Sequence, residues 1–249
     1  MKKYGMLIRG DQMNSNDLDQ IGEDRKVYID STRIVFLDQS SNCTGFAVWS
    51  VDYNRKSARL ESAGPLWFND KWGTGKSLAY FFNALRSYIF IVQGGVTEVV
   101  AEEYFFPMGT KVKGSIVIPK FLGVAQLSAH DEDPALDYME ISASKWRGML
   151  GVQPDKTPAV DSEGKPILTK SGKQKINKDY KEPVKRLVKG LINVPDTFRS
   201  NITGNDRNTP SDMYDSLGMS IAVLKNRGIT RFTEAPHWNE LHLGAGILK

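Results

Sequence analysis

The sequence is poor in the two residue types that build most thiol and zinc sites. It has one cysteine, Cys43, and three histidines, His130, His237 and His242, among 249 residues. A single cysteine excludes an intrachain disulfide, and so few cysteines and histidines argue against a zinc site built from them. We therefore expect a protein of a reducing compartment.

Long apolar runs are missing as well. No stretch approaches the roughly 18 uninterrupted apolar residues that indicate a membrane-spanning helix. The N-terminal segment MKKYGMLIRG carries basic residues but no apolar core, which is not the pattern of a signal peptide. These absences predict a soluble, cytoplasmic protein with no membrane partner.

The composition is otherwise that of an ordinary globular protein, with 40% hydrophobic and 25% charged residues. The net charge of +4 points toward an anionic partner, nucleic acid among them. The length suits one large domain with appendages. We expect a polar arm over residues 1–30, the main domain over 31–227 with a lysine-rich insertion at 152–180, and a C-terminal tail over 228–249.

Apolar periodicity predicts an α/β protein. Three strands joined by short turns favour an antiparallel meander, and the strands and helices that follow favour βαβ units. The expectation is a mixed five-stranded sheet flanked by helices, with a basic β-hairpin inserted around Ser171-Gly172. The predicted strands are 34–38, 44–51, 58–68, 96–103 and 135–142, and the predicted helices are 76–93, 116–130, 142–150 and 182–192 and one from 211 onward; 193–210 is predicted to be a loop.

Four acidic residues are placed where such a sheet would gather them. Asp38 and Glu102 each close an apolar strand, and parallel neighbouring strands bring their carboxyl ends together. Asp212 and Asp215 are three residues apart on one helix and share a face. Clustered carboxylates repel one another, and a hard cation such as Mg²⁺ or Mn²⁺ relieves that repulsion. Glu103 adjoins Glu102, and strand parity alone does not choose between them.

Three segments resemble motifs of the RuvC-type Holliday junction resolvases. LDQSSNCTGFAV is similar to that family's first-strand motif, VVAEEYFF to its second and SDMYDSLGMSIAV to its last, while KEPVKRLVKGLINVP resembles the basic helix before the last motif. The resemblance covers residues 33 to 226. It implies an RNase H-like fold and an Mg²⁺-dependent endonuclease that acts as a homodimer on four-way DNA junctions. The arm, hairpin and tail resemble a phage-encoded branch acting in the host cytoplasm, for which broader cleavage of branched DNA is expected.

Carried over residue by residue, the resemblance makes Asp38, Glu102, Asp212 and Asp215 catalytic ligands of two metal ions. Such a pair of ions activates a water and stabilises the departing 3′ oxygen, which leaves 5′-phosphate and 3′-hydroxyl ends. Phe105 takes the position of the aromatic that contacts a junction base. Lys181 becomes a candidate partner of the scissile phosphate.

Other residues are candidates for DNA contact on their chemistry. Exposed aromatics before Pro107 could wedge into a base step, and lysines and arginines could contact phosphates. A solvated surface ribbon is the alternative for the hairpin lysines, and helix core is the alternative for Trp146 and its basic neighbours. The candidates are Tyr104, Phe105, Phe106, Lys111, Lys113, Lys145, Arg147, Lys165, Lys170, Lys173, Lys175, Lys178, Lys185 and Arg186.

Three other functions compete with a junction-resolving nuclease. A ribonuclease H acting on RNA–DNA hybrids would use the same fold, but the Asp pair at i, i+3 and the aromatic loop favour the first reading. An actin-like or sugar-kinase ATPase shares the DxSxxxTG strand opening, but it needs two such domains. A non-catalytic branched-DNA-binding module would require the four acids to be incidental. Metal dependence separates these functions.

Overall fold

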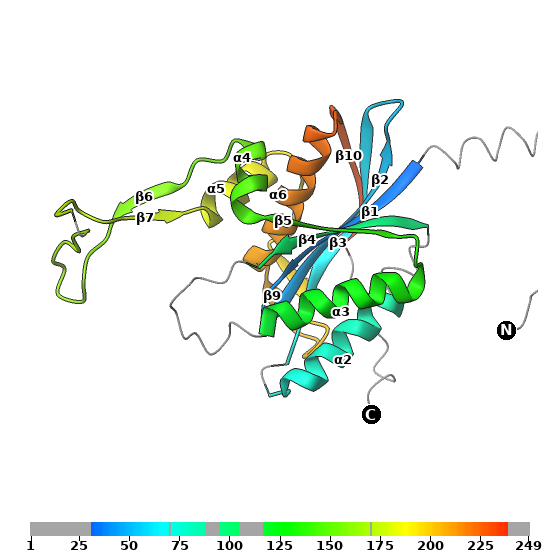
Figure 1. Ribbon diagram of the computed structural model, residues 1–249, viewed down its shortest axis with the longest axis horizontal. Coiled ribbons are helices and arrows are strands. Elements are labelled where there is room, and N and C mark those ends of the chain that lie inside the picture. The colour runs from blue at the N-terminus through cyan, green and yellow to red at the C-terminus, as the bar shows by residue number, and fades with distance from the viewer. Residues whose placement is uncertain (1–30, 70, 88–94, 105–116, 170, 239–249) are drawn as a thin grey trace, which may run out of the picture.

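The computed structural model describes residues 31–69, 71–87, 95–104, 117–169 and 171–238. Its centre is a six-stranded sheet in the order β10-β3-β2-β1-β4-β5 (Figure 1). Strands β1, β2 and β3 form an antiparallel meander, β4 lies parallel to β1, and β5 lies parallel to β4. The strands are β1 Ser31–Gln39, β2 Cys43–Asp52, β3 Ser57–Trp67, β4 Val96–Glu103, β5 Asp137–Ser142 and β10 Arg231–Trp238.

This arrangement confirms the predicted mixed α/β, RNase H-like fold, with one addition. The sheet has a sixth strand, β10, where the tail was predicted to carry no regular structure. β10 pairs in parallel with the outer edge of β3. Without β10, the eleven-residue strand β3 would leave a row of unpaired backbone N–H and C=O groups at the edge of the sheet. The pairing of β10 therefore satisfies a requirement of the tertiary fold, and its own Pro-containing sequence did not indicate a strand.

Helices cover both faces of the sheet (Figure 1). On one side α2, Thr74–Ala84, and α3, Val117–Glu132, pack on Val35, Leu37 and their neighbours. On the other side α6, Ser211–Asn226, is buried from Met213 to Leu224 and is flanked by α4, Ala143–Leu150, and α5, Lys181–Lys189. The predicted helices are thereby confirmed, except that the helix predicted over 182–192 ends at Lys189 and that 88–93 and 116 lie outside the described residues.

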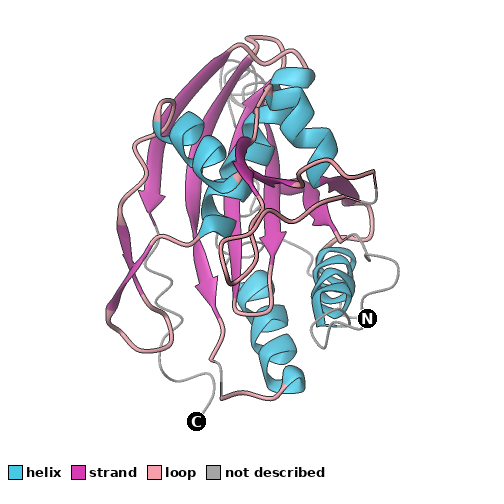
Figure 2. Cartoon of the chain, turned by 90° about the vertical axis from the view of Figure 1, so that its left-hand side faces the viewer, coloured by secondary structure: helices cyan, strands magenta, loops and turns pink. Residues whose placement is uncertain are grey.

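Successive residues of β1 alternate between these two cores. Ile34 and Phe36 belong to the core under α6, whereas Val35 and Leu37 belong to the core under α2 and α3. Figure 2 shows the strands of the sheet side by side with helices packed against them. The alternation carries Asp38, two residues beyond Phe36, onto the α6 face.

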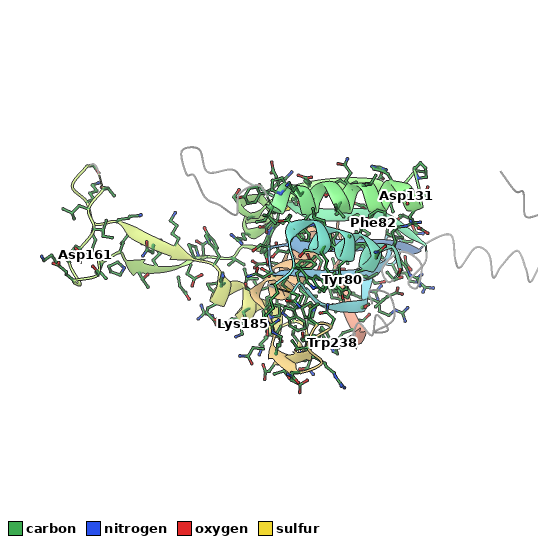
Figure 3. The ribbon with its side chains drawn as sticks, turned by 90° about the horizontal axis from the view of Figure 1, so that it is seen from below. Tyr80, Phe82, Asp131, Asp161, Lys185 and Trp238 are labelled. Carbon is green, nitrogen blue, oxygen red and sulfur yellow. The ribbon has the colours of Figure 1, made fainter. Side chains whose placement is uncertain are left out.

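The lysine-rich insertion projects from this body as an arm (Figures 1 and 3). At its base β6, Asp155–Pro158, pairs antiparallel with β7, Ile176–Asp179. The predicted turn at Ser171-Gly172 is confirmed, because the Thr169 amide donates to the Lys173 carbonyl and Gly172 has φ +75°. The hairpin is longer than predicted.

One predicted loop is wrong in part. Within 193–210 the short strands β8, Thr197–Arg199, and β9, Asp206–Asn208, pair as a small antiparallel hairpin. Only Phe198 of the first strand is buried, so three residues offered no periodic signal that sequence analysis could detect.

Within the described part of the chain, none of the helices has the length and apolarity needed to span a membrane.

Candidate active site

Asp38 and Glu102 meet at the carboxyl ends of β1 and β4. Leu37 lies opposite Ala101 in the parallel register, so the next residue on each strand is the acid. Val100 belongs to the core under α6 and Ala101 to the opposite core, which places Glu102 on the α6 face and Glu103 on the other. Asp38 is 7% exposed, Glu102 is half-buried and Glu103 is exposed. The structure therefore selects Glu102 rather than Glu103.

The first turn of α6 is brought onto this strand end by a glycine. Gly45 of β2 lies opposite Asp38. A Cβ atom at Gly45 would lie 2.1 Å from the Asp212 carbonyl oxygen, so the helix backbone occupies the space of a side chain. This close approach places Asp212 and Asp215 of α6 at the same cleft as Asp38 and Glu102. The pattern Thr-Gly at the start of this strand was noted in the sequence, but its packing role was not.

Three neighbouring side chains hold the acids by hydrogen bonds. Trp146 Nε1 donates to Glu102 Oε2 at 2.7 Å, and Ser40 Oγ donates to Asp212 Oδ2 at 3.0 Å. The guanidinium of Arg147 donates to Asp215 Oδ2 at 3.4 Å.

Sequence analysis did not anticipate these contacts. It left Trp146 undecided between core and phosphate contact, and it assigned Arg147 to DNA. Ser40 was not singled out. A Trp-Arg pair on a short helix carries no pattern that would indicate a carboxylate partner far away in sequence, so the contacts required the tertiary structure.

Arg147 is fixed between two aromatic rings. Its guanidinium carbon lies 4.9 Å from the ring centroid of Trp146 and 5.1 Å from that of Tyr180. Stacking of this kind orders a long side chain and leaves its hydrogen-bond donors at the edge of the plane. The arrangement holds one positive charge beside Asp215.

Burial raises the pKa values of all four acids, and repulsion from neighbouring carboxylates adds to this at Asp38, Glu102 and Asp215. Desolvation, followed by the charges of Glu102, Asp215 and Asp212, raises the pKa of Asp38 well above its ordinary value, and Arg147 opposes this. Burial raises the pKa of Asp215 to about 7 against the lowering effect of Arg147. Burial also raises the pKa of Glu102 and that of Asp212, opposed most by the hydrogen bonds from Trp146 and Ser40 respectively. Perturbed carboxylates in a cleft mark a candidate functional site.

The acids open into a cleft of about 250 Å³. Its lining consists of Asp38, Gln39, Glu102, Glu103, Tyr104, Ile118, Lys181, Ser211, Asp212 and Asp215. A neighbouring cleft of about 490 Å³ shares Glu102, Glu103 and Tyr104 and extends to Ser142, Ala143, Ser144, Arg147 and Tyr180. Lys181 lowers the pKa of both Asp212 and Asp215, so its charge acts on the cluster. The predicted acids and Lys181 are thus brought together.

The donor chemistry of the cluster fits a hard divalent cation. The four predicted acids and Glu103 line one cleft, and carboxylate oxygen is the ligand that Mg²⁺ and Mn²⁺ prefer. Among the described residues, no three acidic, cysteine or histidine side chains already surround a single point. Glu102, Asp212 and Asp215 each accept one of the hydrogen bonds described above through a single carboxylate oxygen, so the second oxygen of each can still face a cation.

The remaining predicted contact residues are distributed over three surfaces. Tyr104 lines both clefts, and Lys145 is exposed on α4. Lys185 lies 4.0 Å from Glu182, and Arg186 forms an ion pair with Asp155 at the base of the arm. Exposed lysines of the arm are Lys165, Lys173, Lys175 and Lys178. Phe105, Phe106, Lys111, Lys113 and Lys170 lie outside the described residues.

Comparisons with known proteins found similarity in structure and not in sequence. No family model and no curated protein match this chain. RuvC of Thermus thermophilus in complex with a Holliday junction substrate aligns with TM-score 0.49 and 13% identity, over 79% of this chain and 96% of that one. A yeast mitochondrial Holliday junction resolvase aligns with TM-score 0.45 and 12% identity, over 79% of each chain. A fowlpox virus resolvase in complex with Holliday junction DNA gives 0.44 and 10%, over 78% and 98%. These proteins are of the class that the sequence motifs resemble.

Proposed function

We propose that this protein is a metal-dependent endonuclease that cuts branched DNA, with four-way junctions as its main substrate. The observation that carries the proposal is the meeting of four carboxylates from β1, β4 and α6 in one cleft, with Lys181 at the same cleft. Such a cluster is costly for the metal-free protein, because burial disfavours the charged form of every acid and Asp38 is further raised by the charges of the other three. A site of this cost is expected to serve cation binding.

In this mechanism the four acids would hold Mg²⁺ or Mn²⁺, with two ions bound. When bound, these ions supply an activated water and neutralise charge at the leaving 3′ oxygen. The chain's own residues orient the reactants. Trp146 and Ser40 fix a carboxylate oxygen of Glu102 and Asp212, and Lys181 is placed to bind a non-bridging oxygen of the scissile phosphate.

The product ends follow from this polarity of attack. Water attacks the phosphorus atom and the bond from phosphorus to the 3′ oxygen breaks. The phosphate stays on the 5′ oxygen, so the cut leaves a 5′-phosphate and a 3′-hydroxyl. A ligase can seal such ends. A four-way junction has two equivalent strands to cut, and a homodimer with two-fold symmetry would present one acidic cluster to each.

The first experiment incubates purified protein with a labelled synthetic four-way junction, with and without Mg²⁺. Parallel reactions hold duplex, a splayed fork and an RNA–DNA hybrid. Paired symmetric nicks in the junction that require the metal support the proposal. Equal cutting of forks indicates a broader branched-DNA nuclease, cutting of the hybrid alone indicates a ribonuclease H, and tight binding without cutting indicates a binding module.

Asp38→Asn is the matched test of the chemistry. The change removes the charge of the most buried acid while keeping its shape, so cleavage is expected to fall by at least about 10²–10³-fold. Junction binding in the absence of metal should persist, because the substitution removes negative charge near DNA. Nicking by the purified variant at the wild-type rate would refute the assignment.

A further inference from the structure

The arm is not a simple hairpin but a fork. The Ala159 amide donates to the Lys175 carbonyl, the Lys175 amide to the Ile167 carbonyl, and the Ile167 amide to the Ala159 carbonyl. This closed ring of three hydrogen bonds joins three legs. One leg is the β6–β7 base, one ends in the tip at residues 161–165, and one ends in the tip whose described residues are 169 and 171–173. We call these the first tip and the second tip.

The two tips differ in charge. The first tip has a net charge of −1, because Lys165 Nζ lies 2.6 Å from Glu163 and offsets that acid alone, while the Asp161 carboxylate accepts bonds from the Glu163 and Lys165 amides. The second tip and the strands beside it, residues 166–178, contain Lys170, Lys173, Lys175 and Lys178 and no acid. Lys178 lies in β7 beside Asp179, so among the described residues the positive charge without a local acid is that of Lys173 and Lys175 in the second leg.

Exposed aliphatic side chains accompany these lysines. Leu168 is 59% exposed at the root of the second tip, and Ile176 is 45% exposed where that leg meets the base. Both lie within 166–178, which is the segment without acids. A surface that alternates lysines with bare aliphatic groups is complementary to a nucleic-acid strand, whose phosphates are anionic and whose sugars and base faces are apolar.

We propose that the second tip, together with Leu168 and Ile176, binds one arm of the branched DNA substrate, and that the first tip does not contact DNA. We call this DNA-binding part of the arm the finger. The inference rests on the proposed function, since it names where the substrate is held. Lys173 and Lys175 contact phosphates, and Leu168 contacts sugar and base surface. A second copy of this chain is a poorer occupant, because a chain of net charge +4 does not complement the lysines.

The position of the finger in the chain limits how far from the active site it can contact DNA. The chain passes from Lys173 along β7 to Tyr180 and Lys181, which line the two clefts. Seven residues of strand span at most about 23 Å. That distance corresponds to about seven base pairs of duplex. The finger therefore contacts DNA within about seven base pairs of the scissile phosphate.

Two pairs of variants test this assignment by fluorescence anisotropy on a four-way junction, in the Asp38→Asn background and over a range of salt concentrations. Lys173→Ala is compared with Lys225→Ala, an exposed lysine at the far end of α6 from the acids. Leu168→Ser is compared with Val160→Ser, which is 52% exposed and lies beside the first tip. All four side chains are exposed, and thermal unfolding checks that each variant folds.

We expect Lys173→Ala to weaken binding about fivefold at 0.15 M salt and to lower the salt slope by about 1. Leu168→Ser should weaken binding about tenfold at every salt concentration and leave the slope unchanged. Lys225→Ala and Val160→Ser should bind as the parent does.

The outcomes separate this inference from the proposed function. If the wild type nicks junctions with Mg²⁺ and the parent binds them, but each variant binds like its control, the finger is refuted and the nuclease stands. If the protein neither binds nor nicks branched DNA, both fail together. If Leu168→Ser changes the sedimentation coefficient of the free protein instead of its DNA affinity, the patch is a protein interface and the finger is refuted.

Discussion

At the scale of single residues, Trp146 is the side chain whose role is most specific. It is fully buried, and its indole nitrogen donates to Glu102 at 2.7 Å. A donor of this kind orients a metal-binding carboxylate, and its loss costs such sites about 10–100-fold in metal affinity. We expect Trp146→Phe to weaken Mn²⁺ binding by this factor, measured by isothermal titration calorimetry.

Trp49 provides the control. It is also fully buried, and its indole nitrogen donates to Ser220 Oγ at 2.9 Å, away from the acids. Trp49→Phe should destabilise the protein to a similar degree and leave Mn²⁺ affinity unchanged. Equal loss of Mn²⁺ affinity in both variants would show that Trp146 contributes to packing alone.

The raised pKa of Asp215 predicts how stability depends on pH. Its pKa is about 7 in the folded protein and near 3.8 when unfolded. Between these values the folded state binds the additional proton, so the free energy of unfolding of the metal-free protein should fall as pH rises from about 4 to 7, and this contribution is constant above that. The group accounts for a few kcal/mol at most, on the order of 1.4 kcal/mol per pKa unit.

Urea unfolding at pH 5 and pH 8 in EDTA measures this effect. The wild type should be more stable at pH 5, and Asp215→Asn should reduce the difference by raising stability at pH 8. The other acids of the cluster shift in the same direction and contribute to the same slope. A wild-type protein with greater stability at pH 8 than at pH 5 would contradict the assigned burial of these charges.

At the scale of elements, the site depends on how closely α6 approaches β2. Gly45→Ala would place a Cβ atom 2.1 Å from the Asp212 carbonyl oxygen, and backbone cannot swing away as a side chain can. We expect a loss of at least about 1–3 kcal/mol in the free energy of unfolding. Cleavage should fall as well, because Asp212 and Asp215 move with the helix. Urea denaturation and junction nicking measure the two effects.

Gly123 in α3 is the matched control. A Cβ atom there meets nothing within 4 Å, and alanine favours helix over glycine. Gly123→Ala should raise the free energy of unfolding by about 0.5–1 kcal/mol and leave cleavage unchanged. If Gly45→Ala were as stable and active as Gly123→Ala, the close approach of α6 to β2 would not be needed for the site.

At the scale of the whole molecule, the arm should be separable from the rest of the protein. Every residue of β6 and β7 is exposed. Replacing residues 156–178 with Asn-Gly, a turn suited to the flanking antiparallel pair of Asp155 and Asp179, should change the free energy of unfolding by less than about 1 kcal/mol. Mn²⁺ affinity should be unchanged, and junction affinity should fall with a smaller salt slope. Loss of Mn²⁺ binding would show that the arm shapes the acidic site.

Much of this molecule was predictable because its signals are local. The apolar runs of β1, β2 and β4 and the i, i+3 pair of Asp212 and Asp215 can be read from short segments. Parallel pairing of β1 with β4 followed from strand order, and it places Asp38 beside Glu102. β8, β9 and β10 gave no such local signal, because their sequences lack a clear alternation of apolar and polar side chains. Each forms where the tertiary fold leaves backbone N–H and C=O groups that need hydrogen-bond partners.

The sequence by itself determined the fold class, Asp38, the pair Asp212 and Asp215, and the lysines of the arm, since residue type and periodicity carry that information. The tertiary structure alone decided that Glu102 and not Glu103 joins the cluster, because that choice depends on which core each face of β4 meets. It alone decided that Trp146, Arg147 and Ser40 hold the acids. The same holds for the fork, in which hydrogen bonds among Ala159, Ile167 and Lys175 separate an acidic tip from a basic one. Contacts between residues distant in sequence have no local pattern, and they exist only once the chain is packed.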